Sequence, residues 1–302
     1  DVRSGKKKIS EQTKVAVIVR GNRKAAEIAN LCRANGKSVV LNSDKPFFLS
    51  QAVRDFYAMI SSYIFVDQPV YTYNYLMTPY ADYDSMISVT EMEQLKGNQK
   101  ALNEYLQNYT VHTNRHKYQK EFRIRPVLSV IREIVENERV IENYIALDKV
   151  RMHGGDWTEA RKNRQALIDA KSYQMNLDKL MEMIQQRMDG EFATLYDLYT
   201  YLTLMISTNR EEMEPDIEMA DDYTSVYIMT VHKSKGLEYD TVIMPAMNGN
   251  LIPHEQTTIL MNEEKAAWYY KRNFSEHMNS VWYDELRKDA VRKGMAEETR
   301  ML

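Results

Sequence analysis

The stretch KVAVIVRGNRKAAEIANLCRANGKSVVLN, Lys14–Asn42, decides the fold. Residues 15–19 form a continuous run of β-branched and small apolar side chains, which is typical of a strand buried on both faces of a parallel sheet. Apolar residues then recur at helical spacing over 26–32, and Gly36 is a typical stop after a helix. Residues 38–42 supply a second strand. The stretch therefore predicts a β-α-β unit with a right-handed crossover.

Helical patterns follow this unit. Residues 47–64 predict an amphipathic helix, and the pattern is helical throughout 85–208. That long segment contains a single proline, Pro126, which agrees with a helical middle because proline breaks helices. The exit, 211–222, holds seven acidic residues in twelve and indicates a solvated connector.

Strand patterns return after the helical middle, at 225–232 and 241–247, and residues 282–302 predict a final helix. The chain is therefore predicted to be an α/β protein whose parallel-sheet domain is interrupted by an all-α inserted domain. The predicted boundaries are 1–84 for the first part of the α/β domain, 85–218 for the insertion and 219–302 for the second part of the α/β domain.

Composition restricts the function classes. The chain has 302 residues and a formal net charge of -3, so a nucleic-acid surface can only be a local patch. Cys32 is the single cysteine, which excludes an internal disulfide and fits a reducing cytoplasm. No apolar run approaches the roughly 20 residues of a membrane span. The chain begins without methionine, which indicates a fragment of a longer protein.

Polar groups follow two of the predicted strands, where open parallel sheets bind their ligands. Arg20 and Asn22 can donate hydrogen bonds to phosphate oxygens and base edges. The second set suits a polyanion and, through one carboxylate, a sugar; it consists of Thr230, His232, Lys233, Ser234, Lys235, Gly236 and Glu238. These residues predict a site that touches phosphates and a sugar. A merely polar, solvated loop is the alternative.

Residues 230–254, TVHKSKGLEYDTVIMPAMNGNLIPH, resemble motif V of the superfamily 1 DNA helicases of the UvrD, Rep, PcrA and RecB/AddA group. That motif is T-x-H-x-x-K-G-L-E-[FY], followed by a strand and a turn ending in [FI]-P. Residues 15–48 are similar to the A-[VI]-L-x-R-x-N segment of the same family. EETRML, residues 297–302, matches the start of motif VI, E-E-x-R-x-L. The helical middle resembles the RecB/AddA branch only loosely.

The resemblance implies a second RecA-like motor domain with a mobile helical insertion that meets duplex DNA or partner regions. Glu238 would then reach the ribose of ATP bound against a first motor domain. The matching positions that would contact single-stranded DNA or shape its path are Arg20, Asn22, Thr230, His232, Lys235 and Gly236.

The departures from the family pattern matter as much. The loop G-x-x-x-x-G-K-[ST] is missing, because Leu31 stands where NGKS, 35–38, would need its first glycine. The carboxylate pair for Mg²⁺ and the arginine of motif VI are also missing. The resemblance therefore implies ATP and Mg²⁺ as cofactors of the full-length protein. This fragment is expected to hold no metal site and no catalytic residue, and not to hydrolyse ATP alone.

A basic run, NRHKYQKEFRIRP, occupies 114–126 and interleaves aromatics with cations, which suits nucleic-acid backbone binding. A solvated helix face explains the run as well, and we favour that plainer interpretation slightly. The candidates for a duplex-DNA patch are Arg115, Lys117, Lys120, Arg123 and Arg125. Phe47 and Phe48 are assigned to the core rather than to base stacking.

We therefore predict a fragment of an ATP-dependent 3′-to-5′ DNA helicase or translocase of repair or recombination, cytoplasmic and associated with the bacterial nucleoid. Its expected partners are single-stranded DNA, a duplex junction, the first motor domain of the same chain, and nuclease or repair subunits, with no membrane. The alternative is a motor-dead, helicase-like DNA-binding or scaffold subunit of a RecB/AddA-type complex. Motif V argues against it, because a dead motor has little need for Glu238.

Overall fold

The computed structural model describes residues 14–81, 87–152, 157–188, 194–208, 212–216, 225–245, 259–271 and 277–301. Of Met188, Lys271, His277, Gly294 and 297–301 it describes the backbone alone. The chain divides into two compact units, Asp1–Met244 and Pro245–Leu302. Each has its own sheet and its own buried cluster. Within the described ranges, none of the helices combines the length and the apolar character that crossing a membrane requires.

A four-stranded parallel sheet forms the α/β part of the first unit, in the order β2-β3-β1-β4. Its strands are β1 (Val15–Val19), β2 (Val39–Asn42), β3 (Val226–Thr230) and β4 (Thr241–Ile243). The predicted strands on both sides of the helical middle thus join one sheet. This confirms an α/β fold with a helical insertion.

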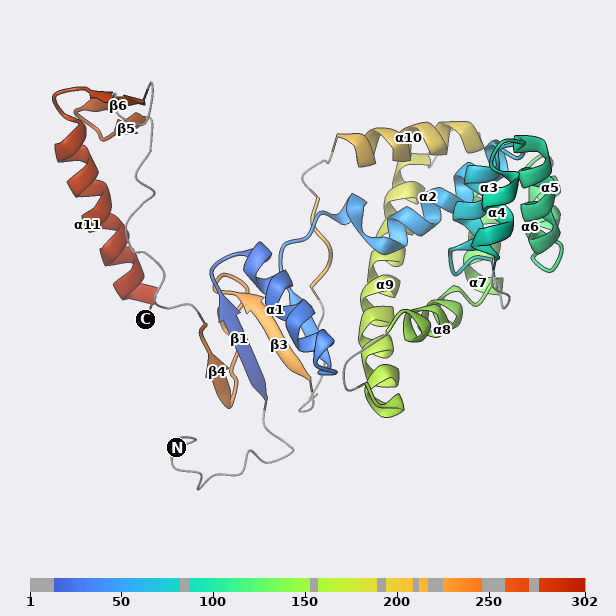
Figure 1. Ribbon diagram of the computed structural model, residues 1–302, viewed down its shortest axis with the longest axis horizontal. Coiled ribbons are helices and arrows are strands. Elements are labelled where there is room, and N and C mark those ends of the chain that lie inside the picture. The colour runs from blue at the N-terminus through green and yellow to red at the C-terminus, as the bar shows by residue number, and fades with distance from the viewer. Residues whose placement is uncertain are drawn as a thin grey trace. The chain divides into compact units, whose positions relative to one another are not determined.

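Both faces of the sheet are covered, which explains the continuous apolar runs in its strands. Helix α1 (Asn22–Ala34) lies along β1 and β3 (Figure 1) and packs Ala25 and Ala29 on one face. On the other face, Ile168 of helix α9 (Glu159–Met188) packs against Tyr227 and Met229. Successive strand residues point to opposite faces, so each strand serves both layers.

The helical part of the first unit surrounds one large core. Besides α9, it contains η2 (Phe47–Leu49), α2 (Gln51–Ile64), α3 (Pro69–Leu76), α4 (Val89–Leu95), α5 (Gln99–Thr110), α6 (Arg115–Glu121), α7 (Val127–Asn137), α8 (Val140–Arg151) and α10 (Leu195–Ser207). Helix α2 runs through the middle of this group and packs against α3, α9 and α10. The helical middle predicted from the sequence is confirmed.

The predicted helix over 47–64 differs from the structure in one detail. The helix is broken at Ser50, whose hydroxyl caps α2 by accepting a hydrogen bond from the backbone N–H of Val53. Phe47 and Phe48 are fully buried in the helical core, as predicted.

Because this core already begins at Phe47, the predicted boundary between 84 and 85 falls inside it. The helical part therefore starts near Phe47 rather than at 85.

The second unit is a small antiparallel sheet packed on a helix. The sheet consists of β5 (Ile259–Met261), β6 (Ala266–Lys271) and β7 (His277–Asn279), and the helix is α11 (Tyr283–Met301). Ala267, Tyr283 and Leu286 form its buried cluster. The sequence predicted the helix but not the strands. Of the matched motif positions, Ile252, Pro253 and His254 lie outside the described residues, and the motif VI positions 297–301 are described by their backbone alone.

Candidate nucleic-acid interface

The two sets of predicted contact residues meet at one edge of the parallel sheet. Val19, the last residue of β1, is paired with Thr230, the last residue of β3. The backbone N–H of Val231 donates to the carbonyl of Val19 at 3.0 Å, so the strands stay together to their ends. The chain leaves both strands at this edge, which places Arg20 beside the start of the loop that carries His232.

The segment after β1 turns directly into α1. The carbonyl of Gly21 accepts hydrogen bonds from the N–H groups of Lys24 and Ala25, both at 3.1 Å, and begins the helix. The first turn of α1 carries no acidic residue. The amides of this turn and the positive end of the helix dipole lie at the sheet edge. Because no carboxylate of the turn neutralises them, they favour an anion there. Arg20 and Asn22 are both exposed there.

Thr230 stands at the base of the same edge. The residue is 3% exposed, and its hydroxyl has no hydrogen-bond partner within the described part of the chain. Its carbonyl accepts from the N–H groups of Lys233 at 3.0 Å and Ser234 at 3.1 Å, which closes a tight turn after β3. A buried hydroxyl without a partner costs about 1–3 kcal/mol. A ligand oxygen or a water at this edge would recover that energy.

The loop after β3 has a defined backbone shape. The hydroxyl of Ser234 donates to the carbonyl of Val231 at 2.8 Å, and the N–H of Leu237 donates to the carbonyl of Ser234 at 3.1 Å. Gly236 has φ +82°, a left-handed conformation that favours glycine. Apart from its two chain neighbours, no atom of the described residues lies within 4 Å of the place where a Cβ would stand beside Gly236. His232, Lys235 and Glu238 carry their side chains on the surface of this loop.

Glu238 sits where the loop is anchored back onto the sheet. The ring of Tyr239 packs against that of Tyr227 with centroids 5.5 Å apart, and its hydroxyl donates to the sulfur of Met229 at 3.7 Å. The Glu238 side chain is exposed, and no hydrogen bond or ion pair of it is seen with the described residues. An exposed carboxylate next to a residue that is packed on the sheet can accept hydrogen bonds from sugar hydroxyls.

Lys233 makes contacts that the sequence did not reveal. Its ammonium lies 2.8 and 3.0 Å from the two carboxylate oxygens of Asp216 and 3.2 Å from Oδ1 of Asp44. The hydrogen bond to Asp216 raises the pKa of Lys233, which keeps the ammonium charged. From the sequence, Lys233 was one of the polar groups of the loop, and no individual role was predicted for it. The acidic stretch 211–222 was its only signal.

The structure corrects the predicted basic patch at Arg115. This side chain is 0% exposed, and its guanidinium donates to the carbonyl of Ser62 at 2.6 Å and to Oε1 of Gln107 at 3.0 Å. Burial lowers its pKa, and no carboxylate is paired with it among the described residues. Arg115 therefore belongs to the helical core and cannot contribute to a surface patch.

The other four cations of the run divide into two kinds. Lys117 and Arg125 form ion pairs with Glu133, at 2.8 and 2.5 Å, and both also approach Glu121. Lys120 and Arg123 are exposed and have no such pair with the described residues. The cationic surface is therefore smaller than the sequence suggested.

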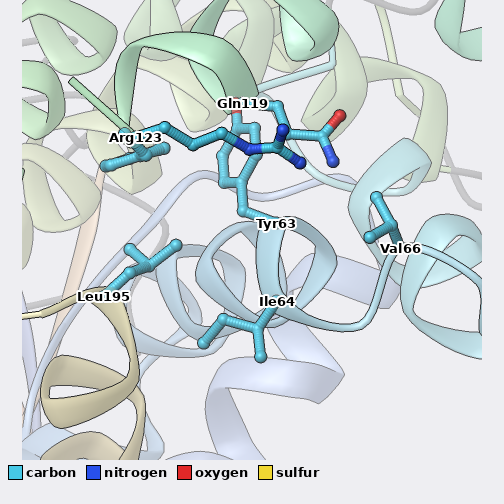
Figure 2. A pocket seen from close by; sticks show the side chains of 7 residues that line it. Tyr63, Ile64, Val66, Gln119, Arg123 and Leu195 are labelled. Carbon is cyan, nitrogen blue, oxygen red and sulfur yellow. The ribbon is translucent and has the colours of Figure 1, made fainter.

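Arg123 also lies at a cavity of about 260 Å³ in the helical part. Figure 2 shows Arg123 and Gln119 on one side of this cavity, above Tyr63, with Ile64 and Leu195 on the other side. Most of the residues that line this cavity are apolar or aromatic, and Arg123 is the one cation among them.

Comparisons with known proteins show the family of this chain. A family model described as the UvrD-like helicase C-terminal domain matches residues 1–271. The ATP-dependent DNA helicase PcrA of Bacillus subtilis is 23% identical over 181 residues, which cover 58% of this chain and 24% of that protein. The ATP-dependent DNA helicase srs2 of Schizosaccharomyces pombe is 28% identical over 118 residues, 36% of this chain and 12% of that protein. The chain thus spans a quarter or less of the curated relatives that it matches.

Proposed function

This chain belongs to the family of UvrD-like helicase C-terminal domains, and from that premise we propose that it is the second RecA-like motor domain and helical insertion of an ATP-dependent DNA helicase or translocase. The intact protein would move 3′ to 5′ on single-stranded DNA in repair or recombination. A first motor domain, outside this chain, would supply the phosphate-binding loop and hold Mg²⁺. ATP bound between the two domains would provide the energy for movement.

The observation that carries this proposal is the shared edge of β1 and β3. Two segments from opposite ends of the chain meet there, and both expose groups that donate hydrogen bonds to phosphate oxygens. Arg20 and the first turn of α1 follow β1, and His232 follows Thr230, whose buried hydroxyl has no partner among the described residues. Phosphate contacts of this kind hold DNA without reading its sequence, as a translocase requires.

The proposal also explains why one loop carries both kinds of residue. Thr230 and His232 at its start would hold the DNA strand, and Glu238 at its end would accept a hydrogen bond from the ribose. Because these groups share one short, hydrogen-bonded loop, a shift of Glu238 on nucleotide binding would move the DNA contacts with it. The carboxylate of Glu238, which has no partner among the described residues, favours an active motor over the alternative, a motor-dead scaffold subunit.

Substitution of His232 tests the DNA contact. His232→Ala is expected to weaken binding of labelled oligo(dT) to this chain about tenfold or more, the loss of one hydrogen bond to a charged phosphate. Fluorescence anisotropy measures this affinity. Lys37→Gln, which removes an exposed lysine ahead of β2, is the control and should bind as the wild type does. Equal affinity of His232→Ala and wild type would remove the loop from the DNA site.

In the parent enzyme, the same change should lower DNA-stimulated ATPase more than basal ATPase.

The exposed cations of the helical part are proposed to contact the duplex at the junction. Neutralising Lys120 and Arg123 together, each to glutamine, should reduce the slope of log affinity against log salt by about 2 for a tailed duplex, since each phosphate contact contributes about 0.9. Lys100→Gln, an exposed lysine on α5, is the matched control. A slope unchanged by the double substitution would leave these residues as an ordinary solvated helix face.

A further inference from the structure

Two segments connect the sheet to the helical part, and they run side by side. Residues 43–47 lead from β2 into the helices, and residues 212–216 lead back toward β3. The N–H of Phe47 donates to the carbonyl of Glu212 at 2.7 Å, and the N–H of Glu214 donates to the carbonyl of Lys45 at 2.9 Å. Pro46 and Met213 form an antiparallel bridge between them. We call these two paired segments the connecting ribbon.

Lys233 joins the loop after β3 to both strands of this ribbon. Asp44 belongs to the outgoing segment and Asp216 to the returning one, and the ammonium contacts both carboxylates. Three donor–acceptor contacts within 3.2 Å match the three protons of an ammonium group. The side chain is 25% exposed, so the pairs are only partly screened by solvent.

The same contacts reach the other half of the sheet edge. The N–H of Asp44 donates to Oδ1 of Asn22, the first residue of α1, at 3.2 Å. A continuous series of contacts therefore runs from Asn22 through Asp44 and Lys233 to Asp216. It begins beside one set of proposed DNA contacts, passes the other set, and ends on the segment that returns from the helices.

We propose that Lys233 is a positioning residue that couples the DNA-contacting loop, 230–238, to the connecting ribbon. Binding of single-stranded DNA by the loop and the position of the helical part would then depend on each other. When DNA orders the loop, the contacts of Lys233 to Asp44 and Asp216 are held in place as well, and the ribbon is stabilised with the loop. This inference rests on the proposed function for the identity of the ligand, while the contacts themselves do not depend on it.

The helical part has a second attachment, which makes the coupling testable. Gln165 of α9 accepts from the N–H of Val39 at 2.7 Å and donates to its carbonyl at 3.2 Å, in buried surroundings. The two hydrophobic clusters of the sheet are built from apolar side chains of other residues and do not use Lys233. Removing the Lys233 ammonium should therefore leave the chain folded and affect only the loop and the ribbon.

Hydrogen exchange of the wild type, Lys233→Met, Lys233→Arg and the exposed control Lys37→Met tests the contact without DNA. Lys233→Met should speed amide exchange in 231–237 and 212–216 together by about three- to fivefold, as expected for the loss of partly exposed ion pairs. Lys233→Arg should restore slow exchange, because its guanidinium can reach both carboxylates, and Asp216→Asn should reproduce the Lys233→Met result. Faster exchange confined to 231–237, or no change at all, would overturn the proposal.

Adding oligo(dT) tests the coupling. In the wild type, protection from exchange should appear in 231–237 and extend to 212–216. In Lys233→Met it should appear in 231–237 alone. Protection of 212–216 that persists in Lys233→Met would overturn the coupling. If oligo(dT) protects no segment of the wild type, the proposed DNA function fails for this chain, whereas the measurement without DNA still decides the role of Lys233.

Discussion

Replacing Arg115 by alanine is expected to lower the free energy of unfolding by about 3 kcal/mol, within the range for truncating a large buried side chain. Arg115 is fully buried and donates to the carbonyl of Ser62 in the last turn of α2. Carbonyls of a last helical turn have no partner within the helix, and a cation there also favours the helix dipole. Alanine removes the donor and the volume together. Urea denaturation of the chain measures the loss.

Two neighbouring substitutions serve as controls for Arg115. Lys120→Ala and Arg123→Ala remove exposed cations from the same basic run and should each change stability by about 0.5 kcal/mol or less. Arg115→Lys should fall between wild type and alanine, because one ammonium cannot reproduce the fork that serves both Ser62 and Gln107. If Arg115→Ala costs no more than Arg123→Ala, the arginine is not a structural part of the core.

The β-α-β unit and the helical middle could be predicted because their signals are local. Residues 15–19 lie in a strand that is covered on both faces, and an unbroken apolar run is the pattern that predicts such a strand. The edge of β1 and β3 followed from the same logic, since parallel strands end on one side. Which residue of the loop after β3 contacts DNA has no such local signal and is still a prediction.

Other features depend on partners far along the chain, and no local pattern reveals them. Nothing in the basic run distinguishes Arg115 from Arg123, because the difference lies in Ser62 and Gln107 of other helices. Lys233 likewise meets Asp44 only because the two connecting segments are paired. Charge counts treat all of these residues alike.

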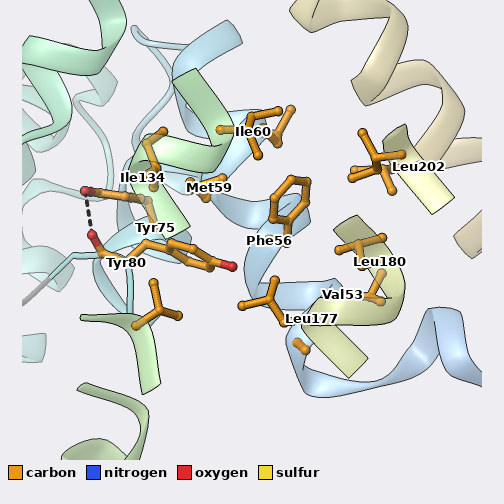
Figure 3. Close-up of a cluster of buried hydrophobic side chains, with 14 of the residues drawn as sticks. Val53, Phe56, Met59, Ile60, Tyr75, Tyr80, Ile134, Leu177, Leu180 and Leu202 are labelled. Carbon is orange, nitrogen blue, oxygen red and sulfur yellow. Dashed lines mark hydrogen bonds between the residues drawn. The ribbon is translucent and has the colours of Figure 1, made fainter. Parts of the chain in front are cut away.

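The domain boundary shows the same limit for apolar residues. Helix α2 is amphipathic whichever part it joins, so its sequence does not say which core it enters. In the structure Phe56, Met59 and Ile60 belong to one buried cluster with Leu180 and Leu202 of distant helices, and Figure 3 shows Phe56 on the side of these two leucines. The short strands β5 to β7 were missed for a related reason, because apolar side chains such as Trp268 also occupy their exposed face and hide the alternation.

Replacing Asp55 by asparagine is expected to stabilise the chain by about 3 kcal/mol at about pH 7.5. Asp55 lies on α2, and burial raises the pKa of its carboxyl to about 6 even though Gln51 donates a hydrogen bond to one oxygen at 2.7 Å. The other oxygen accepts no hydrogen bond of ordinary length from the described residues, and the nearby hydroxyl of Tyr173 lowers the pKa only in part. The charges of Arg54 and Arg151 lower the pKa without reversing the shift. Asparagine keeps the acceptor and removes the buried charge.

The sign follows from proton binding. The pKa of Asp55 rises from 3.8 to about 6 on folding, so between these values the folded state holds a proton that the unfolded state releases. Stability from this group is therefore greatest below about pH 4, falls as pH rises to about 6, and is constant above. A shift of about two units corresponds to about 3 kcal/mol. Asparagine cannot titrate, so Asp55→Asn should remove this part of the decline.

Asp178 provides the matched control for Asp55. It accepts the same kind of hydrogen bond, from Gln174 one turn earlier at 2.6 Å, but it is exposed. Asp178→Asn should leave both the stability near neutral pH and its pH dependence unchanged. Chemical denaturation of the three proteins at a series of pH values gives the comparison. The carboxyl of Asp148, whose pKa burial also raises to about 6, titrates equally in all three and cancels. A wild-type pH profile retained by Asp55→Asn would mean that Asp55 is not the buried charge that limits stability.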